Sequence, residues 1–451
     1  MSPLAYGEAQ PRPVDDRMPI VLVVLDGLGD RPIAELGDRT PAEAAWTPNL
    51  DRLAAAGATG WHLPFGWGRA PSSELAHWSM FGFGDVVFPG RAVLEALGAG
   101  LDVPSGVAVS YAALRPASVR SDRVWITGRA KRVLDDEDAA ALYHEVGPVL
   151  ETHGLAALPV GRQGESVLVA PEDASGAVTD TDPFFEDIHP WLYPVETLPE
   201  GAPFARRLAR ALPDVRAVLL GSEVNAARRA RGIPALDVLT TKWSGTRRQV
   251  PGFADRAGVI GAAVTSTPLY RGLATLLGMP FTHLRAEADP AVDLRQRIAA
   301  AEQLIADGAR FVHVHSKATD EAGHTKDPYA KHDTLEAVDR GLGGLLGLAD
   351  RAVVAVTGDH ATPSTHGLLH AGEPTPLIVA GPTVRADEVT SAGERATRYG
   401  WHGRISADDL LPLLLSYANR PAFLGHRTTP VGAHALPDAP KCMPAGPEPH
   451  R

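Results

Sequence analysis

Apolar runs that end at polar side chains constrain the fold of this chain more than any other sequence feature. Residues 19–25 read Pro-Ile-Val-Leu-Val-Val-Leu and lead directly into Asp26. Residues 310–316, which read Arg-Phe-Val-His-Val-His-Ser, and residues 351–357, which read Arg-Ala-Val-Val-Ala-Val-Thr, are further strand-like runs. Unbroken β-branched runs of this length are typical of parallel strands covered on both faces, because half-exposed strands alternate polar and apolar residues. The runs predict an α/β fold with a mainly parallel sheet.

Helical patterns alternate with these strands. Residues 47–57 predict a helix that has Thr47 as its N-cap. Further helices are expected over residues 291–306 and 329–348, and another strand over residues 217–220. The alternation of strand and helix favours parallel strands joined by helical crossovers.

Asp26 is the first candidate for a chemical role, because carboxylates at strand ends are well placed as cation ligands. A simple cap of the following turn is the alternative. Asp320 and His324 are four residues apart in the segment Lys-Ala-Thr-Asp-Glu-Ala-Gly-His. If that segment is helical, both side chains lie on one face and can bind one metal ion.

A second pair of candidate ligands lies just after the predicted strand at residues 351–357. Asp359 and His360 follow it within Thr-Gly-Asp-His, and His370 lies ten residues further on in a Gly/Pro-containing loop. Together with the preceding candidates, these side chains suffice for two divalent metal ions. Mixed oxygen and nitrogen ligands suit Mn, Zn, Co or Mg to differing degrees.

Ser73 stands in the segment Ala-Pro-Ser-Ser-Glu-Leu-Ala-His, just before a predicted short helix. A hydroxyl there lies near the helix N-terminus, where anions are stabilised, and metal coordination would activate it as a nucleophile. The alternative is an N-cap serine without a chemical role.

The candidate metal ligands and the candidate nucleophile are unevenly spread along the chain, and none of them lies between about residues 106 and 255. This spacing predicts a catalytic domain split by an insertion. The expected boundaries are 18–105 and 256–430 for the two parts of a catalytic metal-binding domain, 106–255 for an inserted substrate-binding domain, and 431–451 for a loose tail.

Composition excludes several classes of function. The formal net charge is −11 and no basic run occurs, which argues against a nucleic-acid partner. No apolar run is long enough for a transmembrane helix. The single cysteine, Cys442, allows no intrachain disulfide and fits a cytoplasmic protein. A monomer is the default expectation, because two linked domains can form a complete site.

The order of these motifs resembles the alkaline phosphatase superfamily and, more narrowly, the cofactor-independent (2,3-bisphosphoglycerate-independent) phosphoglycerate mutases of the archaeal type. The likeness extends from residue 23 to about residue 420. Its matching stretches are 23–32, 47–51, 95–100, 317–324, 357–360, 369–372 and 403–405. The resemblance implies an alkaline-phosphatase-like sheet sandwiched by helices, with an inserted α/β (α+β) second domain.

The resemblance also implies roles for individual residues. One metal ion, manganese or another divalent ion, would be held by Asp26, Ser73, Asp359 and His360. The other would be held by Asp320, His324 and His370. Ser73 would carry the phosphoryl group as phosphoserine, with Lys317 close to the phosphate. The implied activity is that of a cytoplasmic isomerase of glycolysis.

The inserted segment departs from the family pattern. Ser110 stands where the family has an arginine, and Ala112 where it has an asparagine. The nucleophile loop has Glu74 in place of an aspartate. The basic side chains expected to bind substrate are Arg129, Arg132, Lys242 and Arg404. Because loss of a bidentate arginine is not neutral, an altered phosphorylated or phosphonylated substrate is favoured over an ordinary glycolytic mutase.

Alternative functions share the same site. A phosphohydrolase would let water take the group from Ser73, and an intermolecular transferase would pass a phosphoryl or phosphonyl group to a second molecule. A non-catalytic phospholigand-binding protein would have little need for the full ligand set. The sulfatase signature Cys/Ser-x-Pro-x-Arg is absent at Ser73.

Overall fold

The computed structural model describes residues 16–130, 133–161, 164–170, 174–183, 188–422 and 438. Apart from residue 438, the predicted loose tail lies outside this part of the chain. The chain divides into two compact units. The first comprises Met1–Val87, Pro251–Ser266 and Leu277–Arg451, and the second comprises Phe88–Val250 and Thr267–Leu276.

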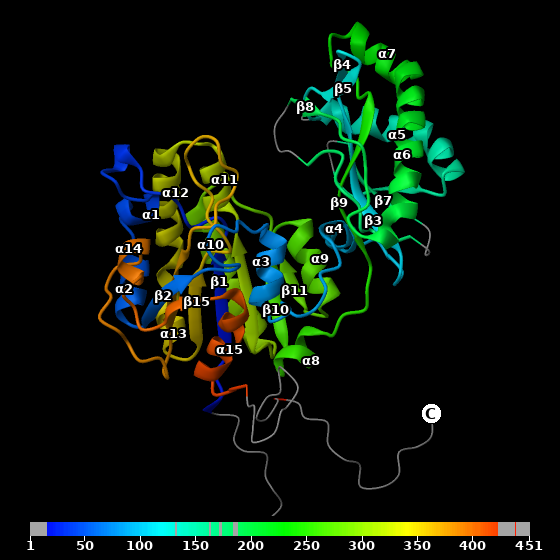
Figure 1. Ribbon diagram of the computed structural model, residues 1–451. Coiled ribbons are helices and arrows are strands. Elements are labelled where there is room, and N and C mark those ends of the chain that lie inside the picture. The colour runs from blue at the N-terminus through cyan, green and yellow to red at the C-terminus, as the bar shows by residue number, and fades with distance from the viewer. Residues whose placement is uncertain are drawn as a thin grey trace, which may run out of the picture. The chain divides into compact units, whose positions relative to one another are not determined.

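The first unit is built on an eight-stranded sheet (Figure 1). In spatial order its strands are β11 (Phe281–His283), β10 (Gly261–Thr265), β12 (Phe311–Ser316), β1 (Ile20–Leu25), β13 (Val353–Thr357), β14 (Thr375–Ala380), β2 (Ala58–His62) and β15 (Gly403–Ile405). Strand β14 is antiparallel to both neighbours, whereas the other neighbouring pairs are parallel. The predicted α/β fold with a mainly parallel sheet is therefore confirmed.

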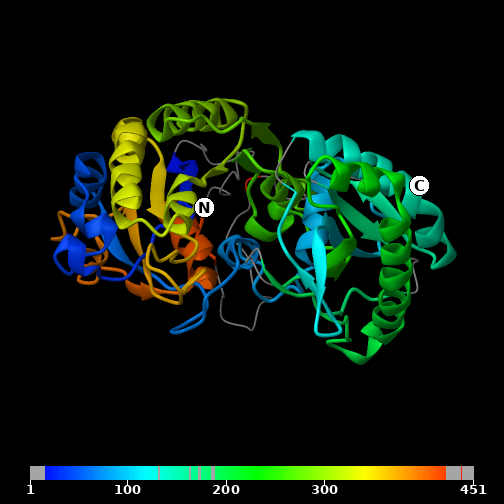
Figure 2. The same ribbon diagram turned by 90° about the horizontal axis from the view of Figure 1, so that it is seen from above.

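Helices cover both faces of this sheet (Figures 1 and 2). One face carries α2 (Pro48–Ala55), α10 (Pro290–Ala306), α12 (Pro328–Gly341) and α13 (Leu345–Ala349). Their apolar side chains pack on alternate residues of the central strands, such as Val21, Val23 and Leu25 of β1. The other face carries α3 (Ser73–Met80) and α15 (Ala407–Tyr417). Burial on both faces explains why β1 and β13 consist almost entirely of apolar residues.

The second unit has an antiparallel four-stranded sheet in the order β6 (Ala156–Pro159), β7 (Glu165–Val169), β3 (Ala108–Arg115), β9 (Val238–Thr246). Helices α5 (Val133–Thr152) and α6 (Ala202–Gly221) belong to the core on one face. Helix α4 (Arg91–Gly98) belongs to the core on the other, where Ala92 and Val93 pack with Val109 and Tyr111. That packing is why this compact unit already starts at Phe88, before residue 106.

The smaller elements complete the described chain. The second unit also has a three-stranded sheet of β4 (Ala117–Arg120), β5 (Arg123–Ile126) and β8 (His189–Pro190), with helices α7 (Glu223–Ala230) and α9 (Pro268–Leu276). The first unit adds short helices at α1 (Pro41–Ala44), α8 (Phe253–Ala257), α11 (Ala318–His324) and α14 (Glu394–Thr397). Among the described helices, none combines the length and the apolar character that crossing a bilayer requires.

One local prediction is wrong. Residues 217–220 were expected to form a strand but lie inside α6. Their apolar character belongs to a longer helical pattern, in which Leu208, Leu212, Val215 and Leu219 are all buried at spacings of three and four residues. The helix expected from residue 47 is confirmed with Thr47 as N-cap, although it ends at Ala55 with Ala56 as C-cap.

Glu394 provides a pH test of this unit. The side chain is buried, and its Oε2 accepts a hydrogen bond of 2.6 Å from Thr40 Oγ1. Burial raises the pKa of Glu394 to about 7. The pKa of Glu394 is higher in the folded than in the unfolded protein. Its contribution to the free energy of unfolding is therefore fully present in acid and is lost as the pH rises through 7.

We therefore expect the free energy of unfolding to fall by up to about 3 kcal/mol between pH 5 and pH 8 through this group alone. Glu394→Gln should remove that part of the pH dependence, as measured by urea unfolding in the presence of a chelator. Glu302→Gln, at an exposed ion pair with Arg351, is the control. Unchanged pH dependence in Glu394→Gln would contradict the assignment.

Candidate metal centre

The candidate ligands meet at one edge of the eight-stranded sheet. Asp26 directly follows β1, Asp320 lies in α11 just after β12, and Asp359 follows β13. These three strands are neighbours and parallel. Because parallel strands end at the same edge, their following loops are brought together. Each of these three carboxylates is buried.

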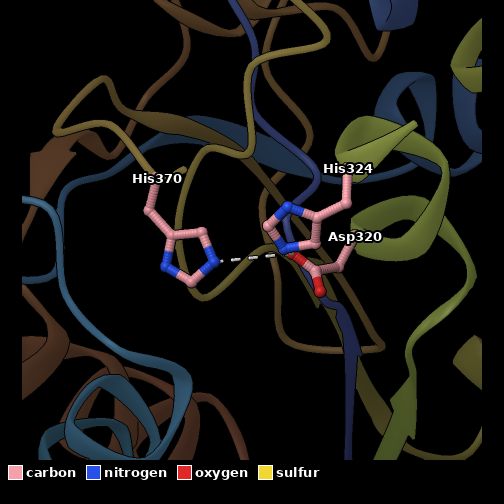
Figure 3. A group of neighbouring side chains, drawn as sticks. All are labelled: Asp320, His324 and His370. Atoms are coloured by element: carbon pink, nitrogen blue, oxygen red, sulfur yellow. Dashed lines mark ion pairs between the residues drawn. The ribbon is translucent and has the colours of Figure 1, made fainter. Parts of the chain in front are cut away.

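The first ligand group consists of Asp320, His324 and His370 (Figure 3). Asp320 Oδ1 lies 3.1 Å from His324 Nε2 and 3.7 Å from His370 Nε2. One ligand atom from each residue lies within 4.8 Å of the others. The segment 318–324 is helical, so the spacing of four residues places Asp320 and His324 together as expected. The His324 side chain is one-third exposed, which leaves this group accessible from solvent.

The second group is centred on His360. Its Nε2 lies 3.0 Å from Ser73 Oγ, 3.3 Å from Asp26 Oδ1 and 3.5 Å from Asp359 Oδ2. Asp26, Asp320 and His360 also place ligand atoms within 4.8 Å of one another, so the two groups are contiguous. The structure thus brings together every residue that the sequence predicts as a metal ligand.

The donor set fits divalent cations. Among the described residues, Asp26 Oδ1 and Asp359 Oδ2 are buried oxygens that accept no hydrogen bond. A buried carboxylate oxygen without a donor is costly, and a bound cation removes that cost. Two ligand atoms at about 2.0–2.2 Å from one ion are themselves roughly 3–3.5 Å apart. The separations around His360 Nε2 fall in that range.

The other oxygens of these carboxylates are held by the protein. Asp359 Oδ1 accepts from the backbone N–H groups of Gly27 and His360, at 3.0 and 3.1 Å. Asp26 Oδ2 lies 3.1 Å from His315 Nε2. Asp26 and Asp359 therefore each have one oxygen fixed and one directed toward His360. Such outer contacts orient metal ligands.

Asp320 is oriented from a different segment. Its Oδ1 accepts a hydrogen bond of 2.7 Å from Thr362 Oγ1. Sequence reasoning missed both Thr362 and His315. His315 had a visible signal, since it is one of two histidines, with His313, between apolar residues of a predicted strand. Thr362 had none, because only the fold brings it to Asp320.

Charge interactions set the pKa values of the three carboxyl groups. Burial raises the pKa of Asp26, but Lys317 and His315 together outweigh it and hold the pKa below its usual range. Burial likewise raises the pKa of Asp320, and hydrogen bonds from His324 and His370 outweigh it. For Asp359, burial and the nearby Asp26 charge raise the pKa well above its usual range. This concentration of negative charge favours cations.

Lys317 lies beside both ligand groups. Its Nζ donates to Asp320 Oδ2 at 2.7 Å and to Asp26 Oδ2 at 3.3 Å. Burial lowers the pKa of Lys317, but Asp26 and Asp320 outweigh it and raise the pKa above its ordinary value. Lys317 is therefore a permanent positive charge, with a side chain that remains 38% exposed.

Ser73 is not an N-cap. The capping position of α3 belongs to Ser72, while Ser73 is the first helical residue and its Oγ contacts His360. Asp26 does not cap the turn after β1 either, because its Oδ2 contacts His315 and Lys317 while the Leu28 N–H donates to the Leu25 carbonyl. The capping contacts considered from the sequence therefore do not form, and the chemical roles of Ser73 and Asp26 stay predictions. His360 itself is neutral near pH 7, since burial lowers its pKa to about 4.

The residues predicted to bind substrate are divided between the two units, and one of them lies outside the described residues. In the second unit, Arg129 Nη1 lies 3.5 Å from the buried Asp182 Oδ2. Burial lowers the pKa of Lys242 to about 8, and Asp182 is the main charge opposing that shift. Arg404 is exposed on strand β15, and Arg132 lies outside the described residues. Their roles stay predictions.

Comparison with known proteins identifies relatives of the whole fold. Residues 18–417 match the family model described as the Metalloenzyme superfamily. A 2,3-bisphosphoglycerate-independent phosphoglycerate mutase from Thermococcus kodakarensis is 34% identical over 415 residues, covering 89% of this chain and 97% of that protein. The mutase of the same name from Pyrococcus abyssi is 33% identical over 413 residues, covering 89% of this chain and 97% of that protein.

Solved structures agree with these relatives. A protein from Pyrococcus horikoshii is 28% identical, with a TM-score of 0.73 over 89% of this chain and 98% of that one. The cofactor-independent phosphoglycerate mutase from Thermoplasma acidophilum is also 28% identical, with a TM-score of 0.61 over 89% and 100% of the two chains. With its ligand residues gathered as described above, this chain belongs to the Metalloenzyme superfamily and, within it, to the cofactor-independent phosphoglycerate mutase family.

Proposed function

We propose that this chain is a two-metal phosphomutase that works through a phosphoserine intermediate on Ser73. The observation that carries the proposal is the position of Ser73 Oγ, 3.0 Å from His360 Nε2 and at the N-terminus of α3. A hydroxyl beside a buried ligand set and an electropositive helix end is suited to attack an anionic phosphate.

The metal positions follow from the two ligand groups. Asp26, Ser73, Asp359 and His360 would hold one ion, and Asp320, His324 and His370 the other. When bound, two divalent ions supply charge that polarises the phosphoryl oxygens and lowers the pKa of the serine hydroxyl. The protein contributes the fixed carboxylates and the neutral imidazole of His360.

In the first step Ser73 Oγ forms a bond to phosphorus, and the bond from phosphorus to the substrate oxygen breaks. The serine hydroxyl loses a proton and the departing oxygen gains one. In the second step a different hydroxyl of the same molecule takes the group back. Lys317 would balance charge on the transferred group, and the position of its ammonium beside both ligand groups, in contact with Asp26 and Asp320, supports this role.

The names of the relatives indicate the class of substrate, and two replaced residues indicate that the substrate itself is different. The relatives named above are phosphoglycerate mutases, so a small phosphorylated hydroxy acid is the expected substrate. In this chain Ser110 and Ala112 are buried in β3, at positions where the family pattern has an arginine and an asparagine. Arg129, Arg132, Lys242 and Arg404 remain candidates for binding the anion. We infer that the substrate differs from phosphoglycerate and is another phosphorylated hydroxy acid or a phosphonylated one.

Ser73→Ala tests the covalent step. We expect the wild-type protein to become phosphorylated on the Ser73 peptide when it is given 3-phosphoglycerate, as detected by mass spectrometry after rapid quenching. Ser73→Ala should not become labelled at this peptide. Its turnover should fall by at least about 1,000-fold, because the variant lacks the proposed nucleophile. Ser72→Ala, at the neighbouring position without contact to His360, is the matched control and should retain both.

Phosphorus NMR of the products identifies where the phosphoryl group goes, when the Mn-loaded protein turns over 3-phosphoglycerate first and the paramagnetic metal is removed only afterwards. We expect 2-phosphoglycerate to form at least about tenfold more slowly than with the Thermococcus kodakarensis relative, because one missing charged contact costs more than 1.4 kcal/mol. Equal rates would make the protein a conventional phosphoglycerate mutase, and release of free phosphate would make it a hydrolase. Turnover by Ser73→Ala would contradict the phosphoserine step.

His324→Ala tests the two-ion assignment. Elemental analysis of the Mn-loaded wild-type protein should give two ions per chain, one for each ligand group. His324→Ala should lose at least tenfold in affinity for one of them, because it removes one of three ligands of that group. His332→Ala is the control, since His332 pairs with Asp333 and belongs to neither ligand group. Equal metal content in both variants would contradict the assignment.

A further inference from the structure

A buried lysine lies behind the ligand groups and is not itself a ligand. Lys331 belongs to α12 and is 0% exposed. Its Nζ donates to the backbone carbonyl oxygens of Gly27 and Gly29, each at 2.9 Å, and of Thr362 at 2.8 Å. It also lies 3.1 Å from Asp30 Oδ2.

The oxygens around Lys331 belong to the segments that carry the ligands. Gly27 follows Asp26, and Thr362 lies two residues after His360. The Thr362 side chain in turn donates to Asp320. One ammonium group therefore links the loop after β1 to the loop after β13, and through Thr362 it reaches the ligand of α11.

The packing around this point allows little adjustment. Gly27 has φ +65, and a Cβ placed there would lie 2.4 Å from Thr362 Oγ1 and 2.9 Å from Asp320 Cα. Asp30 is fixed as well, because its Oδ2 accepts from Ser364 Oγ at 2.9 Å. The loops are thus in contact around the lysine, so a change at its ammonium group is transmitted to the ligands.

The physical role of the ammonium is to neutralise converging oxygens. An ammonium has three N–H donors, and here four oxygens are its acceptors. Without a cation, three carbonyl dipoles and a carboxylate would face one another in a buried space and repel. The arrangement resembles an oxygen-lined site for a monovalent cation in which the cation is built into the chain.

We propose that Lys331 is a positioning residue: its ammonium acts as an internal monovalent cation that holds the ligand segments together and thereby sets the affinity for divalent metal. The inference rests on the metal centre proposed above. It assigns Lys331 no contact with substrate. A purely structural lysine would instead affect the stability of the fold without a specific effect on metal affinity.

Comparison of two variants on the same helix separates these roles. Lys331→Met removes the charge at similar volume. Leu335→Ala, one turn further along α12, removes a side chain that is 1% exposed in the main core cluster and touches none of the four oxygens. Both variants should lower thermal stability. Only Lys331→Met should weaken Mn²⁺ binding, by about 10–100-fold, as measured by calorimetry and by the EPR signal of free Mn²⁺.

Chemical rescue gives a second readout. Lys331→Ala leaves an oxygen-lined space, so ammonium or ethylammonium ions should restore Mn²⁺ affinity several-fold. The same salts should leave Leu335→Ala unchanged. If Lys331→Met does not fold, Lys331→Gln, which keeps two N–H donors without the charge, replaces it in the comparison.

Each outcome decides the inference. Wild-type affinity in Lys331→Met, or an equal loss in Leu335→Ala, would overturn it, as would the absence of rescue by ammonium ions. If the wild-type protein itself binds no Mn²⁺, the proposed metal centre fails, and the inference about Lys331 fails with it. If the wild-type protein binds Mn²⁺ and the two variants behave alike, only the inference about Lys331 fails.

Discussion

The convergence of three buried carboxylates at the end of a parallel sheet is the constraint on which the rest of the structure depends. Asp26, Asp320 and Asp359 would repel one another strongly in a low-dielectric interior. The fold balances them with the Lys317 ammonium on one side and with backbone N–H groups and His315 on the other. The pKa of Asp26 is lowered whereas that of Asp359 is raised, so the protein's own groups neutralise the carboxylate charges only in part. Divalent cations would neutralise the rest.

Much of the site could be predicted from the sequence, because its signals are local. Asp26 and Asp359 follow apolar strands, and the spacing of Asp320 and His324 is that of one helical turn. What the sequence did not reveal depends on contacts between distant segments. Lys331 is 304 residues from the Gly27 carbonyl that it binds, and Thr362 is 42 residues from Asp320. The fold class was predicted for the same local reason, since strands buried on both faces, such as β1 and β13, are mostly apolar.

The error at residues 217–220 has a physical cause. Residues 217–220 look like a strand in isolation, but the buried positions Leu212, Val215 and Leu219 repeat with helical spacing over a longer window. The second unit begins at Phe88 because α4 packs with β3, and no composition change marks that point. Substrate recognition is the least predictable part, because the altered substrate that we propose rests on single replacements such as Ser110 in an otherwise family-like chain.

The account's central claim is that two divalent ions bind in this carboxylate and histidine cluster. Anomalous X-ray scattering from Mn-loaded crystals tests it most directly, because the signal locates manganese without reference to activity. We predict two peaks, one bounded by Asp26, Asp359 and His360 and the other by Asp320, His324 and His370. A single peak, or peaks outside this cluster, would contradict the two-metal account.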